Sequence, residues 1–236
     1  MASLTTVELL THAANSDALE AQVALAVLYE HGVLVDQSYE KARHWFAKSA
    51  GSGSAFAMNQ LALYLEKGLG GQASASDAFQ WASEAAKREY IPAVFTLARY
   101  CEAAIGTTAD LVRASRLYEE AAESGFAAAA SYLALVYEDG LWGAKDQAKA
   151  LHYASLAATL GDSMAANLIG KAFERGRGVP ADEAKAVAWY EAAANAGDPF
   201  ASLKLAAAYS FGQLGLRPNK GKADYYFKKA KEWGGP

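Results

Sequence analysis

The chain has 236 residues, of which 53% are hydrophobic, and a formal net charge of −4 at pH 7. This composition supports a sizeable core. The slight acidic excess argues against nucleic acid as a partner, because binding to phosphates draws on a surplus of Lys and Arg. Cys101 is the only cysteine, so no intramolecular disulfide can form. No apolar run approaches the roughly 18 residues of a membrane-spanning helix, so we expect no membrane insertion.

The first 17 residues contain no basic start followed by an apolar stretch, so they do not resemble a secretory signal. We therefore expect a cytoplasmic protein, although a mature form that carries a new Met1 would have the same sequence. Leu9, Leu10 and Ala14 lie 36 residues before Trp45, Phe46 and Ala50, which belong to a predicted helix. Residues 1–17 are thus predicted to form a helix that caps the first repeat.

From Leu25 onward, one pattern returns every 36 residues: Leu25–Gly32, Leu61–Gly68, Leu97–Ala104, Leu133–Gly140, Ile169–Gly176 and Leu205–Gly212. A fixed period of this size indicates stacked copies of one supersecondary unit. Apolar residues recur with helical spacing in both halves of the unit, and no stretch alternates as a strand would. Each repeat is therefore predicted to contain two helices, here called helix A and helix B.

Glycines mark the expected helix ends. Helix A should end at a glycine in five repeats, because a left-handed residue is needed there. These glycines are Gly32, Gly68, Gly140, Gly176 and Gly212. The third repeat has Ala104 at this place, and a left-handed alanine costs about 1 kcal/mol, so we expect its turn to differ. The pair Asp198-Pro199 is a good start for the last helix A.

The fifth repeat carries the most complete set of recurring residues: Ala165, Gly170, Phe173, Gly176, Gly178, Val179, Asp182, Lys185, Ala186, Trp189, Tyr190, Ala193, Ala194 and Gly197. This pattern resembles the Sel1-like repeat, a relative of the tetratricopeptide repeat, and the resemblance extends from about residue 6 to 233. It implies an all-α, right-handed α/α superhelical solenoid that forms a single domain, 1–236. The six repeats would span 18–53, 54–89, 90–125, 126–161, 162–197 and 198–233.

Members of this family are typically adaptors, often in bacteria, and by similarity to related solenoids helix A would line a concave groove. The partner-binding residues predicted there are Asn59, Leu63, Glu66, Phe95, Arg99, Glu102, Leu135, Glu138, Asn167, Lys171, Glu174 and Phe200. Asn59 and Asn167 occupy equivalent positions, and an asparagine can both donate to and accept from an extended backbone. The alternative is that these two amides have no role in binding.

A glutamate recurs in the last turn of helix A, at Glu30, Glu66, Glu102, Glu138 and Glu174. The helix dipole disfavours an acid there, so we expect a compensating contact. The carboxylates could accept backbone N–H groups of the next turn, which we favour, or form an acidic ladder that faces a basic partner.

Three other features allow two interpretations each. Trp142 lies in a turn, where it could anchor a partner or fold back on its own loop. Cys101 replaces an aromatic residue and is expected to be a small core residue, not a nucleophile. Lysines stud the last helix B, where they could keep the end of the solenoid soluble or form a basic docking patch.

The sequence shows no arrangement typical of catalysis. The four histidines are not spaced for a zinc site, and no phosphate-binding glycine loop is present. Ser38 and Lys41 match an SxxK string, but Lys41 is a recurring residue of the repeat and Ser38 is expected to cap helix B. We predict no catalytic residue, metal or cofactor. The third repeat is predicted to be either a kink or a binding site, because it carries Phe95, Arg99, Cys101 and Ala104.

The sequence therefore predicts a non-catalytic adaptor of bacterial origin that binds a protein or peptide in its groove. We expect it to be a monomer or to self-associate weakly. An immunity- or inhibitor-type protein that occludes one enzyme or toxin is the alternative. An enzyme and a self-associating scaffold remain further alternatives.

Overall fold

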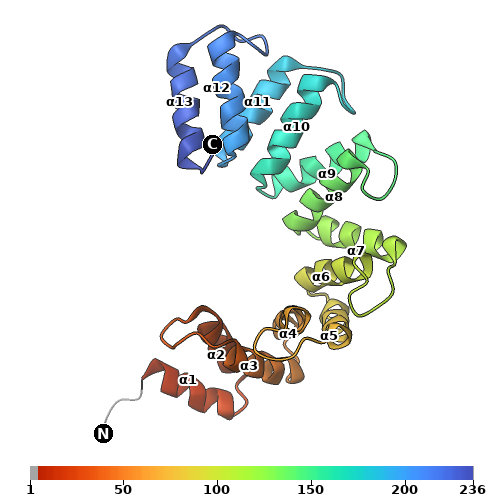
Figure 1. The fold of residues 1–236 in the computed structure, drawn as a ribbon, viewed down its shortest axis with the longest axis vertical. Helices are drawn as coiled ribbons and strands as arrows, with labels where there is room; N and C mark the ends of the chain where they lie inside the picture. The colour runs from red at the N-terminus through yellow and green to blue at the C-terminus, as the bar shows by residue number, and fades with distance from the viewer. Residues whose placement is uncertain (1–4, 236) are drawn as a thin grey trace. The chain divides into compact units, whose positions relative to one another are not determined.

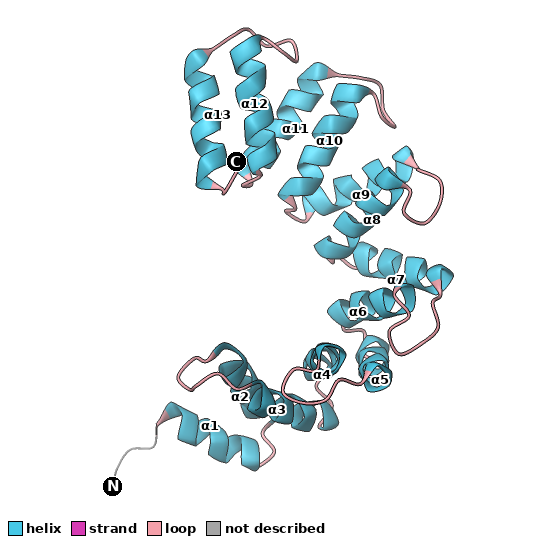
Figure 2. Cartoon of the chain, viewed as in Figure 1, coloured by secondary structure: helices cyan, strands magenta, loops and turns pink. Residues whose placement is uncertain are grey.

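The computed structural model describes residues 5–235, and within them the chain is entirely helical, which confirms the all-α prediction (Figures 1 and 2). The thirteen α-helices are α1 (Thr6–Asn15), α2 (Leu19–His31), α3 (Tyr39–Gly51), α4 (Ala55–Lys67), α5 (Ala75–Lys87), α6 (Ile91–Glu102), α7 (Leu111–Glu123), α8 (Ala127–Asp139), α9 (Gln147–Thr159), α10 (Ser163–Arg175), α11 (Glu183–Asn195), α12 (Pro199–Phe211) and α13 (Lys220–Glu232). From α2 on, even-numbered helices are helix A of a repeat and odd-numbered ones are helix B.

The chain divides into two compact units, residues 1–120 and residues 121–236, each of which has its own core. In the first unit the largest fully buried side chains include Phe46, Tyr100 and Leu25, and in the second they include Tyr190 and Leu133. Small residues surround them, and alanines at equivalent positions are fully or nearly fully buried. The helices of a pair can approach closely because alanine adds so little bulk between them.

The helix A turns follow the glycine prediction, with one informative exception. Gly32, Gly68, Gly140, Gly176 and Gly212 all adopt the left-handed conformation. In the third repeat α6 ends one residue earlier than its counterparts, and Ala104 takes a φ of 56° without being glycine. The turn is therefore kept at the expense of local backbone strain of about 1 kcal/mol.

Helix starts also match the predicted caps. The Asp198 carboxylate accepts the backbone N–H of Ala201 at 2.6 Å, and Pro199 is the first helical residue of α12. The Ser38 hydroxyl accepts the N–H of Lys41 and caps α3. Ser38 thus has the structural task expected of a serine that begins a helix.

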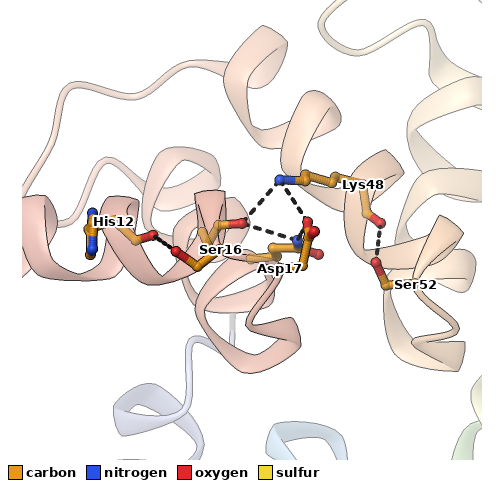
Figure 3. A network of polar contacts seen from close by, with 7 residues as sticks. His12, Ser16, Asp17, Lys48 and Ser52 are labelled. Atoms are coloured by element: carbon orange, nitrogen blue, oxygen red, sulfur yellow. Dashed lines mark hydrogen bonds and ion pairs between the residues drawn. The ribbon is translucent and has the colours of Figure 1, made fainter.

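The predicted N-terminal capping segment contains α1, and its residues 1–4 lie outside the described part of the chain. The Lys48 ammonium of α3 donates to the carbonyl of Ala14 at 3.1 Å and pairs with Asp17, also at 3.1 Å. Figure 3 shows Lys48 and Asp17 facing each other at the end of α1. The Gln22 amide donates to the same carbonyl at 3.2 Å. The last turn of α1 thus bonds to both helices of the first repeat.

Candidate functional site

The second unit carries a cleft on the helix A side of its repeats. Its volume is about 200 Å³, and it is lined by residues of α8, α10 and α12 together with the cap of α12: Ser131, Ala134, Leu135, Met164, Ala165, Asn167, Leu168, Lys171, Asp198 and Phe200. Four of the predicted partner-binding residues thus line one cleft: Leu135, Asn167, Lys171 and Phe200.

Three apolar side chains from three different helices are exposed around this cleft. Leu135 of α8 is 49% exposed, Met164 of α10 is 67% exposed and Phe200 of α12 is 62% exposed. A single exposed apolar side chain needs no explanation, whereas several gathered around one hollow are typical of interaction sites. The cleft therefore offers apolar surface that the fold itself does not bury.

A second, more polar depression adjoins the first and shares Asn167, Lys171 and Phe200 with it. Its other lining residues are Glu174, Arg175, Tyr190, Leu203 and Lys204. The two depressions form one surface that runs from apolar to charged.

Polar groups beneath the cleft are bonded within the protein. Asn167, which is only 6% exposed, donates from its amide nitrogen to the Asp198 carboxylate at 3.1 Å. The Ser131 hydroxyl, at the equivalent position of the preceding repeat, donates to the Asp162 carboxylate. This repeat position therefore ties one helix A to the cap of the next helix A.

Asn59 occupies the same position in the first unit, but its surroundings differ. It is also 6% exposed, and its Oδ1 atom is buried without a hydrogen-bond partner in the described residues. The residue equivalent to Asp198 is Tyr90, which makes no side-chain cap. The two asparagines that share a repeat position thus have different bonding.

The recurring glutamates bond to side chains. The Tyr64 hydroxyl donates to Glu30 at 3.1 Å, and the Arg177 guanidinium donates to Glu138 at 2.7 Å. Glu102 accepts the hydroxyl of Tyr118 at 2.8 Å.

Two of these glutamates have two side-chain donors each. Glu66 receives both arms of the Arg99 guanidinium, at 2.8 and 2.5 Å, and the Tyr100 hydroxyl at 3.1 Å. Glu174 receives the Lys204 ammonium and the Tyr190 hydroxyl, both at 2.6 Å. The expectation of backbone N–H donors is therefore wrong for Glu30, Glu66, Glu138 and Glu174, because tyrosine hydroxyls and cations, most of them from the next repeat, satisfy these carboxylates.

These contacts change acid–base properties. The hydrogen bonds from Arg99 lower the pKa of Glu66. Burial by itself would raise the pKa of Glu174, but the hydrogen bonds from Lys204 and Tyr190 outweigh it and the pKa is lowered. Burial and the nearby Glu66 carboxylate raise the pKa of Tyr100. Both glutamates are thus held as carboxylates, and each fastens neighbouring helices.

The remaining predicted residues of the first unit are engaged in internal contacts. Arg99 pairs with Glu66, and Phe95 packs edge-to-face on Tyr118 with ring centroids 5.4 Å apart. Leu63 is half-buried on α4. The third repeat thus presents fewer free groups than the cleft of the second unit.

The two other residues that the sequence singled out also have neighbours. Trp142 is half-buried and packs edge-to-face on Tyr132 and Tyr137 of the preceding helix, with ring centroids 6.2 and 6.5 Å apart. Cys101 is 1% exposed, and burial raises the pKa of its thiol, which matches a core role.

Met164 and Ser131 were missed by sequence reasoning. Met164 is equivalent to Phe56 and Phe200, and Ser131 is equivalent to Asn59 and Asn167, so translation by 36 residues would have found both. Leu168 carried no such signal, because its position differs from those chosen for the groove.

Residues 5–235 lack two other kinds of feature. No helix there is long and apolar enough to cross a membrane. Across the same residues, no three His, Cys, Asp or Glu side chains are grouped in a way that could hold a metal ion.

Three solved structures of bacterial proteins have similar folds. A Sel1 repeat protein from Oxalobacter formigenes is 27% identical, with a TM-score of 0.80 over 96% of this chain and 99% of that one. The protective antigen c5321 from uropathogenic Escherichia coli is 26% identical, with a TM-score of 0.84 over 98% of this chain but 49% of that one. Immunity protein Pa5087 from Pseudomonas aeruginosa shares the fold at 19% identity, with a TM-score of 0.55 over 91% of this chain and 81% of that one. A comparison with curated proteins found no significant match.

The Sel1 repeat model matches the chain six times, at residues 19–54, 55–90, 92–126, 127–162, 163–198 and 199–232. Proteins built from this repeat generally serve as scaffolds for protein interactions and are typically non-catalytic. Because the matches span nearly the whole described chain, the protein belongs to the Sel1 repeat family.

Proposed function

We propose that this protein is a non-catalytic scaffold that holds a protein or peptide partner on the helix A face of its second unit. The exposure of Leu135, Met164 and Phe200 around one cleft is the observation that carries this proposal. A partner that covers them would remove apolar surface from water at about 25 cal/mol per Å².

The walls of the cleft support the proposal because they are fixed in advance. The Asn167–Asp198 and Ser131–Asp162 bonds join neighbouring repeats beneath it, and the Lys204–Glu174 pair joins α12 to α10. A preformed surface loses little conformational freedom on binding, which leaves more of the contact energy for affinity.

We assign the predicted residues of the first unit a secondary part in binding. Arg99, Glu66 and Glu102 are bonded internally, so a partner would gain less from each of them. Leu63 and Phe95, which are half-buried, offer smaller apolar areas than the residues of the cleft.

Site-specific photo-crosslinking tests the proposal. A photoreactive phenylalanine analogue replaces Phe200 in one variant and Phe227 of α13, which is 47% exposed, in the control. After irradiation in a native lysate, we expect a discrete protein adduct from position 200 that Leu135→Asp abolishes. Equal adducts from both positions would contradict a site at the cleft. Titration of the purified partner then distinguishes a modest adaptor contact from the tight one-to-one complex of an inhibitor.

A further inference from the structure

One face of α10 changes from apolar to basic along its length. Met164, Leu168, Lys171 and Arg175 are spaced by four, three and four residues, which places them on one side of the helix. Met164 and Leu168 line the apolar cleft, and Lys171 and Arg175 line the adjoining depression. The exposed surface thus has an apolar end and a basic end.

Both basic side chains are available to a partner. Lys171 and Arg175 are exposed, and neither forms an ion pair within residues 5–235. The nearby acids are already compensated: Glu174 is paired with Lys204 at 2.6 Å and Glu138 with Arg177 at 2.7 Å. Asp198 is 1% exposed and is used by the start of α12. The charge complementary to this end of the surface is therefore negative.

The cleft itself accepts little more than a side chain. Its volume of about 200 Å³ is below the 300–1,000 Å³ of pockets that enclose a small molecule. Leu135 and Phe200 form its apolar rim from the two flanking helices. These dimensions suit one bulky apolar side chain of a polypeptide.

We propose that the occupant is a short acidic-apolar protein segment, with one Leu, Met or aromatic side chain in the cleft and two Asp or Glu residues on Lys171 and Arg175. This inference rests on the proposed function and specifies the chemistry of the partner.

The rise of the helix sets the spacing of that segment. Met164 and Leu168 both line the cleft, and the point midway between them is about 7 Å from Lys171 and about 13 Å from Arg175 along the axis of α10, at 1.5 Å per residue. An extended chain advances about 3.3 Å per residue and points every second side chain to the same face. The first acid therefore lies about two residues from the apolar anchor and the second about two residues further, so that all three side chains face α10.

The test uses fluorescein-labelled synthetic peptides and the full chain. One peptide carries a Phe anchor with Asp two and four residues after it, and a second carries the same pattern in the reverse chain direction. The control peptides have the two Asp replaced by Asn, the two Asp replaced by Lys, or the same composition in scrambled order. Fluorescence anisotropy is measured up to millimolar peptide at low and at physiological salt.

We expect one of the two patterned peptides to bind at least tenfold more tightly than its Asn and scrambled forms, and to weaken with salt. Lys171→Glu with Arg175→Glu should abolish this binding and gain binding of the Lys peptide. Arg217→Glu with Lys220→Glu makes the same charge change at exposed positions of the second unit outside the cleft, and it should bind like the wild type. Circular dichroism and the thermal midpoint show whether the variants are folded.

The proposal is overturned if neither patterned peptide binds, if the scrambled form binds equally well, or if the Lys171→Glu/Arg175→Glu variant keeps the wild-type affinity. Its failure is distinguishable from failure of the proposed function. A photo-crosslinked partner that depends on Leu135 and Phe200 but not on Lys171 and Arg175 would keep the scaffold and reject the acidic segment.

Discussion

The helix A faces of the two units use the same repeat positions in different ways. Phe56 and Phe200 are equivalent, yet Phe56 is half-buried against Phe46 and Tyr90, with ring centroids 6.2 and 6.4 Å apart, whereas Phe200 is 62% exposed. A basic residue likewise occupies equivalent positions in the two units, at Arg99 and Lys171.

Arg99 of the first unit is bound by Glu66 through both arms of its guanidinium. Lys171, at the equivalent position of the second unit, is exposed and lines the cleft. The first unit thus uses Phe56 and Arg99 in its own packing, whereas the second leaves Phe200 and Lys171 exposed. Equivalent repeat positions therefore do not imply equivalent roles, and four predictions test this difference.

The largest effect is expected for the aromatic pair. Phe56→Ala should lower the free energy of unfolding by about 2 kcal/mol, because the ring contacts with Phe46 and Tyr90 are lost. The loss is smaller than for a fully buried phenylalanine, since Phe56 is only half-buried. Phe200→Ala should change it by less than about 0.5 kcal/mol. Urea unfolding followed by circular dichroism measures both. Equal losses would mean that the two units do not differ in this way.

The basic pair comes next. Arg99→Ala should cost between about 1 and 2 kcal/mol, because Glu66 loses a bidentate, charge-assisted partner in a partly buried site. Lys171→Ala should be nearly neutral in the same urea titration. Arg99→Lys serves as the control, since it keeps the charge but not the planar fork, and it should recover only part of the loss.

The acid dependence of stability should separate the two glutamate clusters. The pKa of Glu66 is lowered in the folded protein, so the unfolded state binds more protons below the ordinary value of 4.5. The stabilisation that the Glu66 carboxylate contributes is therefore complete above pH 4.5, and it is lost as the pH falls through the pKa of Glu66 in the folded protein. Thermal midpoints from pH 3 to 7, at roughly half-unit steps, should show that Glu66→Gln removes part of this acid sensitivity.

Glu174→Gln should have a smaller effect on the same acid limb. Its pKa is also lowered, but burial is the largest influence there and acts in the opposite direction to Lys204 and Tyr190. If Glu174→Gln flattened the profile more than Glu66→Gln, the fork of Arg99 would not be the stronger of the two contacts.

The smallest effect concerns the turns after helix A. Ala104→Gly should raise the free energy of unfolding by between about 0.5 and 1 kcal/mol, because Ala104 has a φ of 56°. Gly176→Ala, with a φ of 65°, should lower it by a similar amount. A Cβ there would lie 3.4 Å from its nearest neighbour, so backbone strain and not a clash would be responsible. Differential scanning calorimetry would show whether the two changes have opposite signs.

The sequence by itself determined the period, the helices and their ends. Recurring alanines, left-handed glycines and the Asp198 cap act within a few residues, where backbone sterics and local hydrogen bonds decide the conformation. The left-handed turn after helix A is present in every repeat, and Ala104 keeps it even without glycine.

Only the tertiary structure decided which side chains are left for a partner. Arg99 reaches Glu66 across 33 positions, and Asn167 reaches Asp198 across 31. Residues that are 36 positions apart have equivalent backbone positions in their repeats. These bonds, however, also require a suitable side chain on the neighbouring repeat. For that reason the sequence could place Lys171 and Arg99 at equivalent positions, but it could not tell that one is bound within the fold and the other is exposed beside an apolar cleft.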